Sequence, residues 1–253
     1  MRESYALELI QKDKRIDGRK FDDFRKIEIK KGIAKNAEGS AQVKLGNTEV
    51  MVGVKLNTGE PFSDTPDEGM LMVGAEFTPM ASPDFESGPP GEDAVELARV
   101  VDRGLRESKC IDLEKLCIEE GEKVWCIFTD IHIINNQGNL LDAAALAAIA
   151  AVLDAKMPKM EKDEIKRGEY EGPLPVKFKP INVTVCKVGD KFLLDPALEE
   201  EDVIDAKLSV SVRDDDNICS LQKQGHKELD VKDLEKMIDI ALKKSKEIRK
   251  MLK

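Results

Sequence analysis

Between residues 25 and 80, three segments have the polar and apolar pattern of β-strands. RKIEIKKGI, residues 25–33, reads as a half-buried strand, and residues 40–56 form two β-rich runs on either side of Gly46-Asn47, a dipeptide that favours a short hairpin turn. A third strand is predicted from Leu71 to Met80. Two segments rich in proline and glycine, NTGEPFSDTPDE and SPDFESGPPGED, flank this strand. We therefore expect exposed loops on both of its sides.

Apolar residues three and four positions apart then replace the alternation and predict two helices with a strand between them. The first helix begins near Asp93 and has acidic residues in its first turn. The apolar run from Val124 to Ile134 predicts a buried strand, and NNQG after it predicts a turn. In the second helix, DAAALAAIAAVLDA, Asp142 is a cap or a first-turn acid. Its many alanines would let this helix lie close against a sheet, so we expect it to be central.

The second half of the chain repeats the order of strands followed by a helix. Residues 156–177 are polar and contain several glycines and prolines, which predicts a boundary between two lobes. Two hairpins should follow, turning at Gly189-Asp190 and at residues 214–217, and a helix from about Val231 ends the pattern. This order predicts an α+β fold of two similar lobes.

We therefore divide the chain into four parts. They are an N-terminal helical segment, a first lobe, a linker and a second lobe, at residues 1–24, 25–157, 158–177 and 178–253.

Composition restricts the kind of protein that this chain can be. The chain has 253 residues, a formal net charge of -10 and no run of roughly 18 apolar residues, so we expect neither export nor a membrane span. Its five cysteines are scattered without a C-x-x-C pair, and its two histidines are isolated, which predicts a reduced cytoplasmic protein without a metal site. The acidic charge argues against indiscriminate binding of nucleic acid but leaves room for a local basic strip.

Three segments in order resemble the RNase PH family of phosphate-dependent exoribonucleases. They match the family's first hairpin at Ala37–Val54, its first helix at Glu96–Arg106 and its acidic catalytic stretch at Leu193–Asp202. RIDGRK, DTPDEG, SPDFESGPP and GNLLDAAALAA resemble, more narrowly, the non-catalytic RNase PH-like subunits of the archaeal exosome. This resemblance covers most of residues 14–253. It implies an RNase PH-type fold, similar to domain 2 of ribosomal protein S5, with mixed sheets packed on helices in both lobes.

The resemblance implies that active family members hold the attacking phosphate in a glycine-rich turn with an arginine at a helix N-terminus, which suits an anion. The matching stretch here is Gly138, Asn139, Leu140, Leu141 and Asp142. Leu141 stands in the place of the arginine, and the carboxylate of Asp142 would repel an anion. We therefore expect a degenerate phosphate site.

The acidic stretch also departs from the family pattern. The resemblance places Asp195 at the first catalytic aspartate, Glu201 at the second, and Lys207 where a third carboxylate is common. Asp195 could be a surviving general acid, or it could belong to a solvated acidic turn. The first interpretation has little support without a phosphate site. We expect a vestigial acidic site, Asp195 and Glu201, and no catalytic residue in this chain.

Three arginines, Arg99, Arg103 and Arg106, fall on one face of the first helix. Judged alone, Arg99 and Arg103 would form exposed pairs with Glu96 and Glu107, each worth a few tenths of a kcal/mol. The resemblance implies instead that Arg99 and Arg103 contact the RNA backbone beside the active site of a neighbouring subunit. A guanidinium grips phosphate oxygens without reading the base. Whether Arg106 also reaches RNA stays open.

The resemblance also implies a set of partners. This chain would pair with an active RNase PH-like exosome subunit, and three such heterodimers would form a hexameric ring that degrades single-stranded RNA from 3′ to 5′. RNA-binding cap proteins of the S1 or KH type would bind the ring. We expect no cofactor in this chain, and any Mg²⁺ would be held by the catalytic partner. Two alternatives are an autonomous exoribonuclease that uses Asp195 and Glu201, and a purely structural spacer.

Overall fold

The protein is described here from a computed structural model, in which residues 2–162 and 164–252 are placed. Its elements, in chain order, are α1 (Arg2–Gln11), β1 (Ile27–Lys31), β2 (Gly39–Leu45), β3 (Thr48–Gly59), β4 (Met70–Phe77), α2 (Glu92–Glu107), the 3₁₀ helix η1 (Leu113–Leu116), β5 (Cys117–Glu119), β6 (Lys123–Asn135), α3 (Leu140–Asp154), β7 (Lys156–Glu161), β8 (Glu164–Pro173), β9 (Ile181–Val188), β10 (Lys191–Leu194), α4 (Leu198–Glu201), β11 (Ala206–Val212), β12 (Ile218–Gln224) and α5 (Val231–Arg249). The predicted order of strands and helices is thus confirmed in both halves of the chain.

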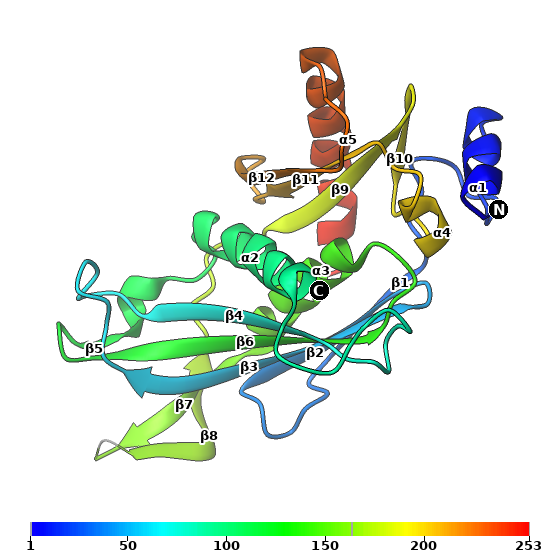
Figure 1. Cartoon of the computed structure of the whole chain (residues 1–253). Helices are drawn as coiled ribbons and strands as arrows, with labels where there is room; N and C mark the ends of the chain where they lie inside the picture. The colour runs from blue at the N-terminus through cyan, green and yellow to red at the C-terminus, as the bar shows by residue number, and fades with distance from the viewer. Residues whose placement is uncertain (1, 163, 253) are drawn as a thin grey trace.

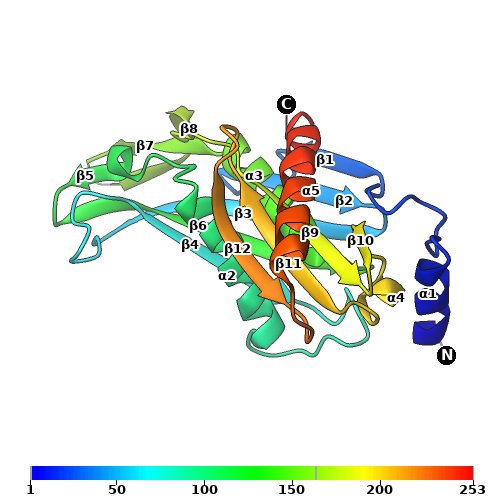
Figure 2. The same ribbon diagram turned by 90° about the horizontal axis from the view of Figure 1, so that it is seen from above.

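The layers alternate between sheet and helix (Figure 1). A six-stranded sheet lies at one side, α2 and α3 cover it, a four-stranded sheet packs on these helices, and α5 closes the other side. Figure 2 shows α5 lying across β9 and β11. α3 touches both sheets, through β2 and β3 of one and β9 of the other. The helix predicted to be central therefore is central.

The larger sheet has the order β1-β2-β3-β6-β4, with β5 paired to β6. Its strands are antiparallel except for β4, which runs parallel to β6. The hairpin predicted at Gly46-Asn47 is confirmed, because Leu45 pairs with Thr48 across that turn and Gly46 has a φ of 59°. The first residue of β2 packs closely on α3, since a side chain at Gly39 would place its Cβ 2.5 Å from the carbonyl oxygen of Ala151.

The smaller sheet has the order β10-β9-β11-β12, and all of its strands are antiparallel. The expectation of mixed sheets therefore holds for the first lobe and is wrong for the second. The physical reason is connectivity. Short turns join β9 to β10 and β11 to β12 as hairpins, and β10 and β11, which α4 connects, lie on opposite sides of β9 and do not pair with each other.

Three local expectations need correction. Much of the expected linker, residues 158–177, belongs to a hairpin of β7 and β8, whose largely exposed side chains lack the apolar alternation that marks a half-buried strand. Arg167 anchors this hairpin to the carboxylate of Glu38 at 2.8 Å. The helix of the N-terminal segment covers only Arg2–Gln11 of residues 1–24. Within residues 195–202, for which a solvated acidic turn is one of two interpretations, the chain forms the short helix α4.

Membrane insertion by a helix has no support in the part of the chain that is described. None of the helices at residues 2–162 and 164–252 is long and apolar enough to cross a bilayer.

Candidate functional site

The turn that leads into α3 brings together the two groups of site residues expected from the sequence. Gly138 and Asn139 both have positive φ angles, 88° and 56°. A Cβ at Gly138 would lie 2.5 Å from the carbonyl oxygen of Pro196, so only glycine lets this turn pack against the acidic stretch. The backbone N–H of Asn139 donates to Glu201 at 3.1 Å, and its side-chain amide donates to Asp195 at 3.0 Å.

Asp195 is fully buried and accepts hydrogen bonds from two arginines. Arg19 donates to Oδ2 at 2.8 Å, and Arg25 donates to Oδ1 at 2.7 Å and, through Nε, to Oδ2 at 2.9 Å. The backbone N–H of Arg25 adds a contact to Oδ2 at 2.7 Å. Asp195 is therefore not part of a solvated turn, and both of its oxygens are engaged by donors within the chain. It is arranged as a structural anchor.

Arg15 makes a second buried contact between the N-terminal segment and α4. It is paired with Glu200, and it also donates to the backbone carbonyls of Leu194 and Asp195, both at 2.8 Å. Arg15, Arg19 and Arg25 thus tie residues 15–25 to residues 194–200. Sequence reasoning missed this role, because more than 160 residues separate the partners and no local pattern connects them.

Asp142 lies in the first turn of α3, but its carboxylate faces β9. It accepts hydrogen bonds from the backbone N–H of Thr184 at 3.0 Å, from the hydroxyl of Thr184 at 2.8 Å, from Asn182 at 2.8 Å and from Asn139 at 3.1 Å. The expectation that this carboxylate would meet an incoming anion directly is therefore wrong. Burial raises the pKa of Asp142 to about 6, although these hydrogen bonds oppose the change.

This pKa predicts a pH dependence of stability. The native protein binds more protons than the unfolded chain between the ordinary pKa of 3.8 and about 6, so the contribution of Asp142 to the free energy of unfolding falls as pH rises through that window and levels off above it. Urea unfolding at several pH values should show this component in the native sequence. It should be absent from Asp142→Asn, which cannot titrate. Equal pH profiles for the two proteins would contradict the assignment.

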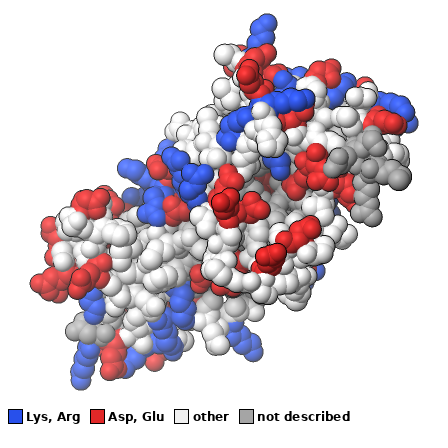
Figure 3. Space-filling model, in the orientation of Figure 1, with Lys and Arg blue, Asp and Glu red and all other residues white. Residues whose placement is uncertain are grey.

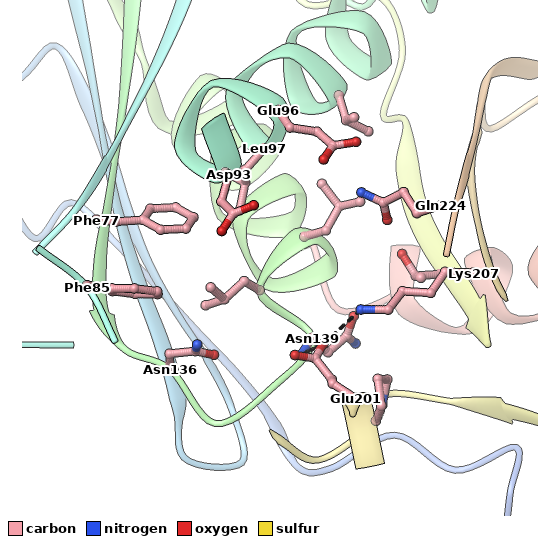
Figure 4. Close-up of a pocket in the computed structure, with 15 residues that line it drawn as sticks. Phe77, Phe85, Asp93, Glu96, Leu97, Asn136, Asn139, Glu201, Lys207 and Gln224 are labelled. Atoms are coloured by element: carbon pink, nitrogen blue, oxygen red, sulfur yellow. Dashed lines mark hydrogen bonds and ion pairs between the residues drawn. The ribbon is translucent and has the colours of Figure 1, made fainter. Parts of the chain in front are cut away.

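A cavity of about 300 Å³ opens beside the turn (Figure 4). Its lining residues are Phe77, Phe85, Asp93, Glu96, Leu97, Val100, Asn136, Asn139, Leu140, Leu141, Thr184, Pro196, Glu201, Lys207 and Gln224. Asp93 and Glu96 approach from α2, and Glu201 and Lys207 lie on the other side, paired at 3.4 Å. Three carboxylates thus face one ammonium group, and among residues 2–162 and 164–252 no arginine lines the cavity. Such a lining disfavours inorganic phosphate.

The three arginines on one face of α2, Arg99, Arg103 and Arg106, differ in their contacts. Arg106 pairs with Asp102 at 2.7 Å and donates to the backbone carbonyl of Leu71 at 2.6 Å. Arg99 and Arg103 are exposed, and within the described residues neither makes a hydrogen bond or ion pair, so the pairs expected with Glu96 and Glu107 are absent. Figure 3 shows Lys and Arg side chains gathered over α2. Two arginines are thus available to a ligand.

Comparison with known proteins places the chain in a family. Residues 23–158 match domain 1 of the 3′ exoribonuclease family, RNase PH, and residues 180–244 match its domain 2. The chain belongs to the RNase PH family.

Similar proteins from archaea span nearly the whole chain. The exosome complex component Rrp42 of Archaeoglobus fulgidus is 49% identical and aligns with 100% of this chain and 96% of its own length. The Rrp42 of Methanothermobacter thermautotrophicus is 50% identical over 94% of this chain and 89% of its own. The expected resemblance to RNase PH-like subunits of archaeal exosomes is confirmed.

Solved structures give the same result for the fold. A chain of the Archaeoglobus fulgidus exosome with RNA bound to the active site has a TM-score of 0.94 at 49% identity, covering 100% of this chain and 98% of that chain. A chain of an archaeal exosome core has a TM-score of 0.89 at 46% identity, and the match covers 99% of this chain and 96% of that chain. Rice Rrp46 has a TM-score of 0.73 at 20% identity, and the match covers 94% of this chain and 98% of that chain. This similarity supports the fold alone. The predicted RNase PH-type fold is confirmed.

Metal ligands do not gather in the described part of the chain. Within residues 2–162 and 164–252, no three His, Cys, Asp or Glu side chains are placed to hold a metal ion, and all five cysteines are free. The expectation of no cofactor in this chain stays a prediction.

Proposed function

We propose that this chain is a non-catalytic subunit of an exosome ring that degrades RNA from 3′ to 5′ by phosphorolysis. One observation carries the proposal: the cavity beside α3 has Leu141 where the family resemblance places a phosphate-binding arginine, and its charged lining is mostly acidic. Two multiply charged anions must meet in phosphorolysis, so a cavity without a cationic cradle cannot assemble the reactants. Relatives named as exosome components, about half identical over nearly the full chain, support the assignment to the ring.

The work would be divided between two homologous subunits. An active RNase PH-like partner supplies the phosphate site and the catalytic carboxylates, together with any Mg²⁺, and three heterodimers form the ring. This chain supplies part of the interface and presents Arg99 and Arg103, which are exposed on α2, to the backbone of single-stranded RNA. Cap proteins of the S1 or KH type and a cytoplasmic location belong to the same proposal.

An autonomous exoribonuclease that uses Asp195 and Glu201 is disfavoured by the contacts of both residues. Asp195 is buried between Arg19 and Arg25, and Glu201 accepts from Asn139 and Lys207. The two arginines beside Asp195 are engaged by that carboxylate and by backbone carbonyls, and among residues 2–162 and 164–252 no arginine lines the cavity beside Glu201.

Reconstitution tests the proposal. The purified chain, the active homologue from the same source and a mixture of the two would be supplied with phosphate and a 3′-tailed RNA, and the release of nucleoside diphosphates would be measured together with particle mass. We expect no release by this chain alone and rapid release by a mixture with the mass of a six-membered ring. Release by the isolated chain at the rate of the complex would disprove the non-catalytic assignment.

A further inference from the structure

A second, larger hollow lies at the far end of α2 from the site beside α3. It occupies about 600 Å³ between the β3–β4 connection, the last turn of α2 and η1. Its apolar residues are Phe62, Met70, Leu71, Leu105, Ile111 and Leu113. Phe62 is 55% exposed. A large aromatic ring that is exposed in this way is typical of a surface that another protein covers. We call this hollow the β4 groove.

The cations of the β4 groove are largely neutralised within the chain. Arg106 is held by Asp102 and by the carbonyl of Leu71, and Lys177 pairs with Asp112 at 2.8 Å. These pairs leave Lys109 as a lining cation whose ammonium group forms no hydrogen bond or ion pair with the described residues.

The acids of the β4 groove are mostly unpaired. Among residues 2–162 and 164–252, no side chain forms a hydrogen bond or ion pair with the carboxylates of Asp64, Glu68, Glu107 or Glu114. Figure 3 shows acidic side chains gathered at the end of the molecule where the β3–β4 connection lies. Four free carboxylates against one free ammonium group repel nucleic acid and attract a positively charged chain.

The loop that carries Phe62 is fixed at several points. The N–H of Gly69 donates to the carbonyl of Leu113 at 2.9 Å, the N–H of Gly121 donates to the carbonyl of Pro66 at 2.9 Å, and the N–H of Thr65 donates to the carbonyl of Phe62 at 3.1 Å. A side chain at Gly69 would meet Leu116 at 2.5 Å, so the loop packs closely on η1. A surface that is ordered before binding loses less entropy when a partner docks.

We propose that the β4 groove binds a partner protein through an extended segment in which basic residues alternate with aliphatic or aromatic ones. The apolar side chains would contact Phe62 and Leu113, and the basic side chains would pair with Asp64, Glu68 and Glu114. Charge complementarity selects this occupant, because an acidic segment would be repelled and a purely apolar one would leave the rim unpaired. From α2 the groove takes only Leu105, Arg106 and Glu107, so Arg99 and Arg103 lie outside its lining.

A labelled synthetic peptide tests this proposal on the full chain. The probe is a fluorescent heptapeptide of sequence RLKFRLK, in which basic and apolar residues alternate, and binding is followed by fluorescence polarisation. Phe62→Ser and, separately, the triple variant Asp64→Lys, Glu68→Lys, Glu114→Lys should each weaken binding by about tenfold. Circular dichroism confirms that each variant is folded, since all four side chains lie at the surface or the rim.

A matched control separates the groove from general acidity. Glu228→Lys, Glu235→Lys and Asp239→Lys make the same change in charge at exposed positions far from the groove, and they should leave the affinity unchanged. Heptalysine, which has no apolar side chains, should bind much more weakly than the probe. Equal loss in the control variant, equal binding of heptalysine, or full affinity of both groove variants would each overturn the proposal.

Discussion

Replacing Arg99 and Arg103 together by glutamate should weaken RNA binding by the reconstituted complex about tenfold or more at moderate salt, with ring assembly intact. Both side chains are exposed on α2 and form no hydrogen bond or ion pair with the described residues, so the substitution disturbs no interaction within the chain. The change in charge opposes the RNA backbone directly. Titration of labelled single-stranded RNA at several salt concentrations is the measurement, and the salt slope should fall by about 0.7 for each phosphate that the variant no longer neutralises.

The control for this prediction reverses two other exposed cations. Lys243 and Lys250 lie in and just beyond α5, and Lys243→Glu with Lys250→Glu changes the net charge equally. We expect normal RNA binding from this protein. If the two double variants behave alike, or if the arginine variant degrades RNA normally, this chain is a spacer in the ring and the arginines are an ordinary solvated helix face.

Replacing Asp195 by alanine should lower the free energy of unfolding by about 3–5 kcal/mol, the range for breaking a buried ion pair by removing one partner. The substitution leaves Arg19 and Arg25 half-buried without their shared carboxylate and removes an acceptor from Asn139. Segments 15–25, 137–139 and 194–200 all lose an attachment. Urea unfolding followed by circular dichroism measures the change.

The matched variant is Asp190→Ala, which removes an exposed carboxylate in the turn between β9 and β10. It should change stability by less than about 0.5 kcal/mol. A general acid would give a different result: Asp195→Ala would then unfold like the unchanged protein while a phosphorolytic activity of the chain disappeared. That outcome would contradict the anchoring role assigned to Asp195.

The sequence predicts most elements of this fold because their signals are local. The turn at Gly46-Asn47, the alanine-rich helix after Asn139 and the apolar run of β6 each lie within a short window, where periodicity and turn chemistry decide the structure. The β7–β8 hairpin escapes prediction for the opposite reason. Its strands are mostly polar, with only Met157, Met160 and Ile165 packed on the core, and they depend on main-chain pairing and on distant anchors such as Arg167 with Glu38.

The candidate site is predicted in its residues but less well in their roles. The family resemblance brings Gly138–Asp142 and Asp195 together, and the structure places them side by side. It does not reveal that the carboxylate of Asp142 faces β9, nor that Asp195 is enclosed by arginines from residues 19–25. Side-chain direction and long-range pairing depend on tertiary packing, which no pattern within a single segment encodes.

The position of α3 between the two sheets has a consequence for how this architecture can be divided. The two family domains matched by the chain, at residues 23–158 and 180–244, read as modules along the sequence. In the folded chain one hydrophobic cluster joins β2, α3, β9 and α5, so neither domain has a complete hydrophobic core of its own. Recombination that exchanged one half between homologues would have to keep the second face of α3 compatible with a foreign sheet. We therefore expect the two domains to be inherited together, with changes in sequence tolerated mainly in the loops and on the exposed faces of the helices.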